Sequence, residues 1–263
     1  MAEQDNNYYY GGHIGPAEEQ AAAEQKKQNQ RTADILAATS GAMHASFSNI
    51  AATGTDEIST EKFNTIIAVM LFYGFAVNAI LCFAFGDSII SLALGHPAAY
   101  LLIYFVGVIV GMIICRKTEN PVVGFIGYNL IVVPMGIFIT PFLQYSGIDT
   151  VRYAFCVMGV CMMLMIGLAQ VYPKFFLSIG RMLFACLLIG LVGELVMWCL
   201  NLATGIFDFI FVGIFLGYIG FDWAVAQNYP KTKTSAIRAA YMIYVDLINL
   251  LIRLIRIISK ERN

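Results

Sequence analysis

Seven long runs of apolar residues follow one another through the sequence from residue 65. Each run is close to the roughly 20 residues that an α-helix needs to cross the ~30 Å hydrocarbon core of a bilayer. Because backbone groups in hydrocarbon must be hydrogen-bonded within the protein, each run is expected to form one helix. The sequence therefore predicts an all-α integral membrane protein, a bundle of seven transmembrane helices at residues 65–85, 98–115, 122–143, 151–172, 182–200, 206–226 and 236–258.

The composition agrees with this fold class. Hydrophobic residues make up 59% of the chain and charged residues 13%, and the mean hydropathy is +0.72. A soluble domain needs a more highly charged surface, so the apolar surplus is expected to contact lipid. The net charge of −1 gives no basic excess for nucleic acid. The cysteines show no CxxC or Cys/His spacing, and no cofactor is predicted.

Turn-forming residues separate the apolar runs, and a polar segment precedes them. The predicted turns contain Gly86-Asp87, Gly95-His96-Pro97, Asn120-Pro121, Ser146-Gly147 and Tyr229-Pro230. Residues 1–60 have too few apolar side chains to build a core. We expect two regions: a disordered cytoplasmic tail at 1–60, in which residues 18–38 form a helix if a partner or a membrane surface supports one, and a transmembrane domain at 61–263.

The positions of Lys and Arg predict the orientation. Alternate loops are basic, and the tail is basic too, which places the N-terminus in the cytoplasm; a bacterial plasma membrane is the preferred location. Seven spans would then put the C-terminus outside, although Arg253, Arg256, Lys260 and Arg262 cluster there. Two explanations remain open: the seventh segment does not fully cross, or its basic residues act inside the bundle.

The seventh segment carries a stripe of polar residues along one helical face. Steps of three and four residues connect Arg238, Met242, Asp246, Asn249, Arg253, Arg256 and Lys260. The interpretation we favour is an inward-facing polar path, because Asp246 would lie near mid-depth in a spanning helix, where a charge is costly and usually functional. The alternative is an amphipathic helix at the membrane surface.

Asp222, near the end of the sixth segment, is the second candidate. The short connection through residues 229 and 230 makes the last two helices antiparallel neighbours, so Asp222 and Asp246 can reach similar depths. Two carboxyls in a poorly hydrated site cannot both ionise cheaply, which makes the pair a natural proton sensor. When both are ionised, their oxygens could hold Ca²⁺.

Three further residues are candidates for lining the path or pairing with the aspartates: Asn249, Arg238 and Arg253. Glu194 lies deep in the fifth segment and needs a partner, which the sequence does not identify. Asp208 lies near a helix N-terminus, where the helix dipole favours a carboxylate.

Two stretches resemble a known family. The sequence Tyr-Val-Asp-Leu-Ile-Asn-Leu-Leu at 244–251 resembles the last-helix signature of the Bax inhibitor-1 family, and Gly-Tyr-Ile-Gly-Phe-Asp at 217–222 resembles its sixth-helix element. The resemblance implies a seven-helix bundle that leaks Ca²⁺, with Asp222 and Asp246 as a pH-sensitive latch.

This chain departs from the family pattern at two places. Trp223-Ala224 stands where Thr-Gln usually follows the sixth-helix aspartate. The second segment, 98–115, has none of the basic residues that pair with the latch in bacterial members. Arg238 and Arg253 are the residues that could substitute for it.

Two classes of function compete. The leading hypothesis is a pH-sensitive Ca²⁺ or cation leak channel. The alternative is a regulatory membrane protein that binds a membrane protease or stress-response partner through its tail. An enzyme is not expected, because no nucleophile and base stand at a recognisable spacing and there is no glycine-rich phosphate loop.

Overall fold

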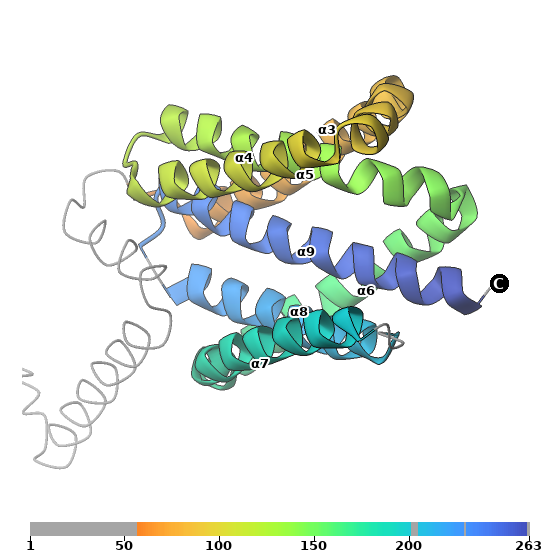
Figure 1. Ribbon diagram of the computed structural model, residues 1–263. Coiled ribbons are helices and arrows are strands. Elements are labelled where there is room, and N and C mark those ends of the chain that lie inside the picture. Colours follow the sequence, from red (N-terminus) through yellow and green to blue (C-terminus); the bar gives the residue numbers. More distant parts are fainter. Residues whose placement is uncertain (1–56, 201–204, 229, 262–263) are drawn as a thin grey trace, which may run out of the picture.

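The computed structural model describes residues 57–200, 205–228 and 230–261, and within these ranges the chain is all-helical (Figure 1). Each helix covers one of the seven predicted runs. The helices are α3 (Thr60–Gly95), α4 (Pro97–Lys117), α5 (Pro121–Ser146), α6 (Ile148–Val171), α7 (Pro173–Cys199), α8 (Gly205–Asn228) and α9 (Lys233–Glu261). Only the last residues of two runs, 172 and 200, lie one residue beyond the end of their helices, α6 and α7. The predicted tail up to residue 56, Tyr229 of the last turn and Arg262 lie outside the described residues.

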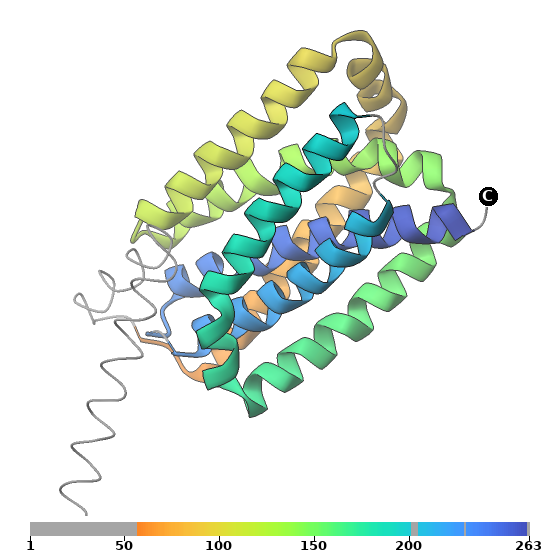
Figure 2. The ribbon, with the colours of Figure 1, turned by 60° about the horizontal axis from the view of Figure 1, so that its bottom comes forward.

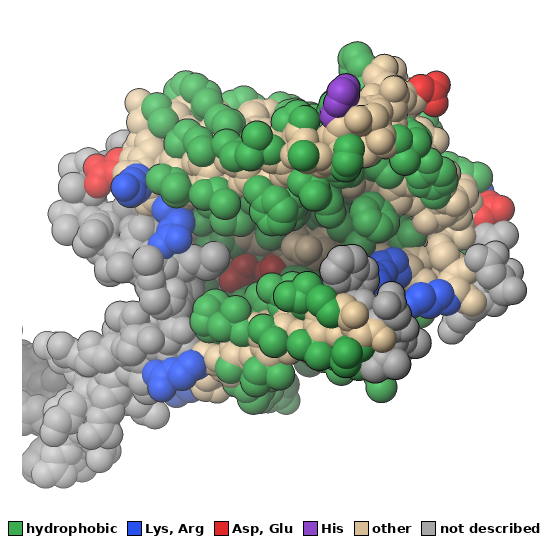
Figure 3. Space-filling model, in the orientation of Figure 1, with side chains coloured by type: hydrophobic (Ala, Val, Ile, Leu, Met, Phe, Trp, Pro, Cys, Tyr) green, Lys and Arg blue, Asp and Glu red, His purple; other side chains and the backbone are tan. Residues whose placement is uncertain are grey.

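Six of these helices, α3 to α8, are long and apolar enough to cross a membrane. Many of their large apolar side chains point outward; Phe72 and Phe83 are each 78% exposed and Ile189 is 72% exposed. Figure 3 shows hydrophobic side chains over most of one face, with Lys and Arg mostly towards its ends. Such a surface suits lipid rather than water. The helix α9 is as long, but its polar stripe makes it less apolar than the others, so a seventh span remains a prediction.

The helix α9 lies in the middle of the bundle. Figure 1 shows it between a group formed by α3, α4 and α5 and a group formed by α7 and α8, and Figure 2 shows α8 running alongside it. It packs against α3, α5, α6 and α8. Apolar residues on several of its sides are fully buried, among them Ala240, Ile243, Leu247 and Leu250. This burial contradicts the surface-helix alternative, in which the apolar side would lie in lipid headgroups.

One predicted turn is wrong. Gly86-Asp87 was expected to end the first helix, but α3 continues to Gly95. Gly86 lies against the Gln144 side chain of α5, and Gln144 Nε2 donates a hydrogen bond to the Cys82 carbonyl at 3.0 Å. The missing side chain at Gly86 therefore allows close helix packing instead of a turn.

The turns after α4 and α5 are found where they were predicted. The Asn120 side chain accepts a hydrogen bond from the Val122 backbone N–H at 2.8 Å and so caps the start of α5. Gly147 alone connects α5 to α6, with φ +77° and ψ 151°. This conformation is essentially restricted to glycine.

We predict that Gly147→Ala lowers the free energy of unfolding by about 1–3 kcal/mol, the usual cost of such backbone strain. Unfolding of the detergent-solubilised protein, followed by circular dichroism, measures this loss. Gly95→Ala is the matched control, because it also ends a helix and a Cβ there would meet no atom within 4 Å. Equal losses in the two variants would contradict the assignment of strain to Gly147.

Candidate functional site

The structure brings Asp222 of α8 and Asp246 of α9 together. Their carboxyl groups lie close enough to each other for a hydrogen bond when one of them carries a proton, and the two residues are only 6% and 8% exposed. The Asp246 Oδ2 atom is buried and has no hydrogen-bond partner among the described residues. Two carboxyl groups in contact can share one proton between them, since a proton on one oxygen donates to the other carboxylate.

The surroundings of the pair are mostly apolar. Tyr218, one turn before Asp222 in α8, is close enough to interact electrostatically with both carboxyls. The indole of Trp223, which follows Asp222, is buried, and its Nε1 atom has no hydrogen-bond partner. The pair therefore lies in a poorly hydrated part of the α8–α9 interface, where few groups compete for its charge.

The pair alone is too small for a complete Ca²⁺ site. Among the described residues, no group of three or more His, Cys, Asp or Glu side chains could hold a metal ion. Two carboxylates supply at most four oxygens, whereas Ca²⁺ takes six to eight. The two aspartates by themselves therefore supply too few oxygens to complete the ligand shell of a Ca²⁺ ion.

Arg238, near the start of α9, binds the end of α4. Its Nε donates to the Cys115 carbonyl at 3.1 Å, and its Nη2 donates to the carbonyls of Arg116 at 2.9 Å and Thr118 at 3.4 Å. The residue is 1% exposed. The first two of these carbonyls belong to the last turn of α4, where carbonyls have no partner within the helix, and Thr118 is the residue that follows α4. Arg238 therefore compensates this helix end with a buried positive charge.

Asn249, the next polar residue of the stripe after Asp246, is half-buried. Its Nδ2 donates to the Val245 carbonyl at 2.8 Å, which ties the side chain to its own helix.

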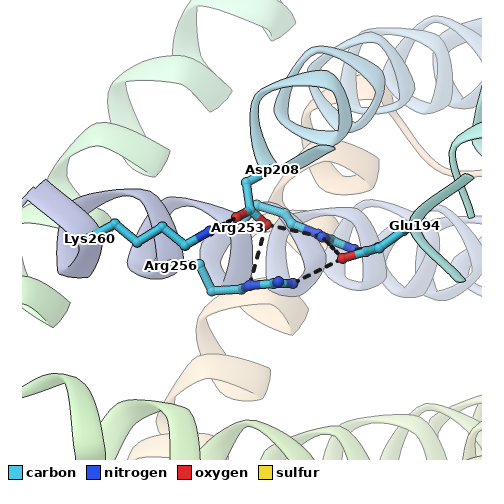
Figure 4. A network of polar contacts seen from close by, with 5 residues as sticks. All are labelled: Glu194, Asp208, Arg253, Arg256 and Lys260. Carbon is cyan, nitrogen blue, oxygen red and sulfur yellow. Dashed lines mark hydrogen bonds and ion pairs between the residues drawn. The ribbon is translucent and has the colours of Figure 1, made fainter. Parts of the chain in front are cut away.

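Five charged residues form a network towards the end of α9 (Figure 4). Arg253 binds Glu194 of α7 through two hydrogen bonds, of 2.7 and 2.8 Å, and its Nη1 also lies 3.1 Å from Asp208 of α8. Arg256 reaches both carboxylates, at 3.2 and 3.3 Å. Lys260 binds the second oxygen of Asp208 at 2.9 Å. The Asp208 side chain is fully buried, and the network ties three helices together.

Sequence reasoning found only part of this network. It named Arg253 and Glu194 as candidates but not as partners, and it assigned Asp208 to its helix dipole alone. The sequence does contain an indication of the network. The polar stripe continues through Arg256 and Lys260, and the isolated acids Glu194 and Asp208 lie in the two preceding segments. The network also supports one explanation of the basic C-terminal cluster: three of its members bind carboxylates inside the bundle.

We predict that Arg253→Met lowers the free energy of unfolding by about 3 kcal/mol, near the lower end for breaking a buried ion pair. The variant removes one of the two arginines that Glu194 and the buried Asp208 share, while Arg256 and Lys260 remain. Thermal unfolding in detergent measures the loss. Adding Glu194→Gln to the variant should recover part of it, because one uncompensated charge is then removed.

The control for this prediction is Arg152→Met. Arg152 lies 3.9 Å from Asp149, and the two side chains are 76% and 58% exposed. Removing such a surface pair costs about 0–1 kcal/mol. If Arg253→Met were no more destabilising than Arg152→Met, the network would not stabilise the bundle.

A comparison with protein-family models gave a match over residues 60–263, to the family described as inhibitor of apoptosis-promoting Bax1. No curated protein and no solved structure matched the chain. The matched region contains all the described helices, including both aspartates and the charged network. Together with the apolar helices α3 to α8, the match identifies a multi-pass integral membrane protein. The chain belongs to the Bax inhibitor-1 family.

Proposed function

We propose that this protein is a pH-sensitive leak channel for Ca²⁺, in which Asp222 and Asp246 bind either a proton or the passing cation. The observation that carries the proposal is the contact between the two buried carboxyl groups at the α8–α9 interface. The proposed role is transport rather than catalysis, in a bacterial plasma membrane with the N-terminus in the cytoplasm.

The proton and the cation compete for the same oxygens. Two ionised carboxylates in contact repel each other strongly in a poorly hydrated site, and either a shared proton or a divalent cation relieves that repulsion. The free Asp246 Oδ2 atom is an acceptor available to the cation. Since protonation removes a negative charge from the site, acid should weaken cation binding there.

The interface between α8 and α9 supports a path through the bundle. Asp246 and Arg253 are seven residues apart on one face of α9, which corresponds to about 10 Å along the axis. Polar groups therefore follow each other from the aspartate pair towards the charged network at the end of the helix. The network would oppose a cation because its three positive charges outnumber its two carboxylates, which suits a slow leak.

The sensor in this proposal needs no basic residue in α4. Arg238 and Arg253 are the two residues that could have replaced a basic residue in α4. Arg238 is bound to the end of α4, and Arg253 is bound to the two carboxylates of the charged network. The aspartates then respond to pH mainly through each other.

We predict that Asp222→Asn and Asp246→Asn each lower Ca²⁺ flux into proteoliposomes and flatten its dependence on pH. An amide keeps the size of the side chain but cannot bind a proton in this range or supply a negative charge. Flux is measured with an entrapped Ca²⁺ dye between about pH 6 and pH 8, around the neutral range where His and shifted carboxyls titrate.

Glu119→Gln, at an exposed position in the α4–α5 turn, is the matched carboxylate-to-amide control and should conduct like the unmodified protein. Unchanged flux and pH dependence in both aspartate variants would remove the pair from the mechanism.

A regulatory role through the tail is the second candidate. The observation that favours it is that the family match begins at residue 60, so the tail lies outside the region shared with the family. We predict that deleting residues 1–56 leaves Ca²⁺ flux in proteoliposomes unchanged if the protein is a channel. Loss of a co-purifying membrane protease on this deletion would instead favour the regulatory role.

A further inference from the structure

A cavity of about 280 Å³ lies between α3, α5, α6 and α9, away from the charged network. Its lining is apolar except for Asn78 and Gln144. Asn78 Nδ2 donates to Tyr244 Oη at 2.6 Å, and Gln144 Nε2 donates to the Cys82 carbonyl at 3.0 Å. Asn78 Oδ1 is buried beside Gly136 and has no hydrogen-bond partner among the described residues. The wall on the α9 side is formed by Ile248 and Leu251. The interior therefore suits a hydrocarbon ligand.

The cavity opens towards the lipid. Phe83 and Ile148 belong to its lining, yet they are 78% and 61% exposed, so they mark its mouth. Away from the mouth, the rings of Phe75 in α3 and Phe155 in α6 meet edge to face, with centroids 5.7 Å apart. The mouth lies next to the α5–α6 turn at Gly147, close to the ends of two helices.

Two polar hollows adjoin this mouth. One, of about 220 Å³, shares Phe83 and Gln144 with the cavity and contains Asp87. The other, of about 500 Å³, shares Ile148 with it and contains Asp149. Neither hollow is lined by Lys or Arg among the described residues. The mouth of the apolar cavity thus has hydrogen-bonding surroundings that include two carboxylates, one of which, Asp149, also lies 3.9 Å from the exposed Arg152.

We propose that the cavity holds an acyl chain of a membrane lipid, with an amine-bearing zwitterionic headgroup lying over the two acidic hollows. At about 280 Å³ the cavity is nearly twice the size of the ~150 Å³ apolar cavity that binds benzene. It is too small for a partner helix, whose diameter with side chains is about 10–12 Å. A lipid, with an apolar acyl chain and a polar headgroup, matches both the apolar cavity and its polar mouth.

The bound chain would fill the space that separates α6 from α3. Empty apolar space of this size costs packing energy, because its lining atoms have no contacts on one side. The lipid would therefore act as an additional packing element between α6 and the helix that carries Asp246. The site is independent of the proposed leak, since none of its lining residues belongs to the aspartate pair or to the charged network.

The test uses the full chain in lipid nanodiscs. Phosphatidylethanolamine and phosphatidylglycerol carry the same photoactivatable diazirine acyl chain, and cross-linked peptides are mapped by mass spectrometry. We expect cross-links concentrated on the cavity-lining parts of α3, α5 and α6, and several-fold stronger with phosphatidylethanolamine. Labelling spread evenly over the exposed apolar faces would overturn the proposal. Equal labelling by both lipids would overturn the headgroup assignment.

Ala79→Trp places a large ring in the cavity and should reduce this labelling several-fold. Ile80→Trp is the matched control, because Ile80 is the next residue of α3, is 59% exposed and lies outside the lining. Val151→Phe, from α6, fills the same space if Ala79→Trp does not fold. Labelling that persists in a folded cavity-filling variant would rule out the site.

Discussion

The structure depends on the enclosure of one partly polar helix, α9, by the apolar helices packed around it. A guanidinium or carboxylate that faces hydrocarbon is expensive, and backbone groups there have no water as a partner. Because α9 packs against α3, α5, α6 and α8, its polar stripe faces protein instead of lipid. The outer helices contact the bilayer with apolar side chains, and the polar chemistry of the protein is concentrated inside.

The polar groups of α9 are satisfied to different degrees along its length. Near the start, Arg238 binds carbonyls at the end of α4. Towards the end, Arg253 holds two carboxylates from two other helices. Between these positions Asp246 meets another acid, Asp222, and one of its oxygens has no hydrogen-bond partner among the described residues. Complete pairing fixes helices in place, whereas incomplete pairing leaves a group that can exchange a proton or an ion.

The local sequence was sufficient for much of the fold. Apolar runs of spanning length predicted the existence and order of all seven helices, since hydropathy and length determine helix formation in a membrane almost by themselves. The ends were less exact, because α3 continues ten residues beyond its run and α7 begins nine residues before its run. The turn at Gly86-Asp87 was wrong because a glycine that permits a turn equally permits close packing, and only the position of Gln144 distinguishes the two. The antiparallel arrangement of α8 and α9 followed from their short connection, and so did the approach of Asp222 to Asp246.

The sequence by itself determined the helices, the polar stripe of α9 and the candidate aspartates, because these depend on the periodicity and length of single segments. Only the tertiary structure decided which charges are partners. Glu194 lies 59 residues from Arg253 in the chain and Asp208 lies 45 from it, and such pairings depend on how helices pack side by side. The lipid-facing cavity was equally invisible in the sequence, since it is formed by four helices that are each simply apolar there.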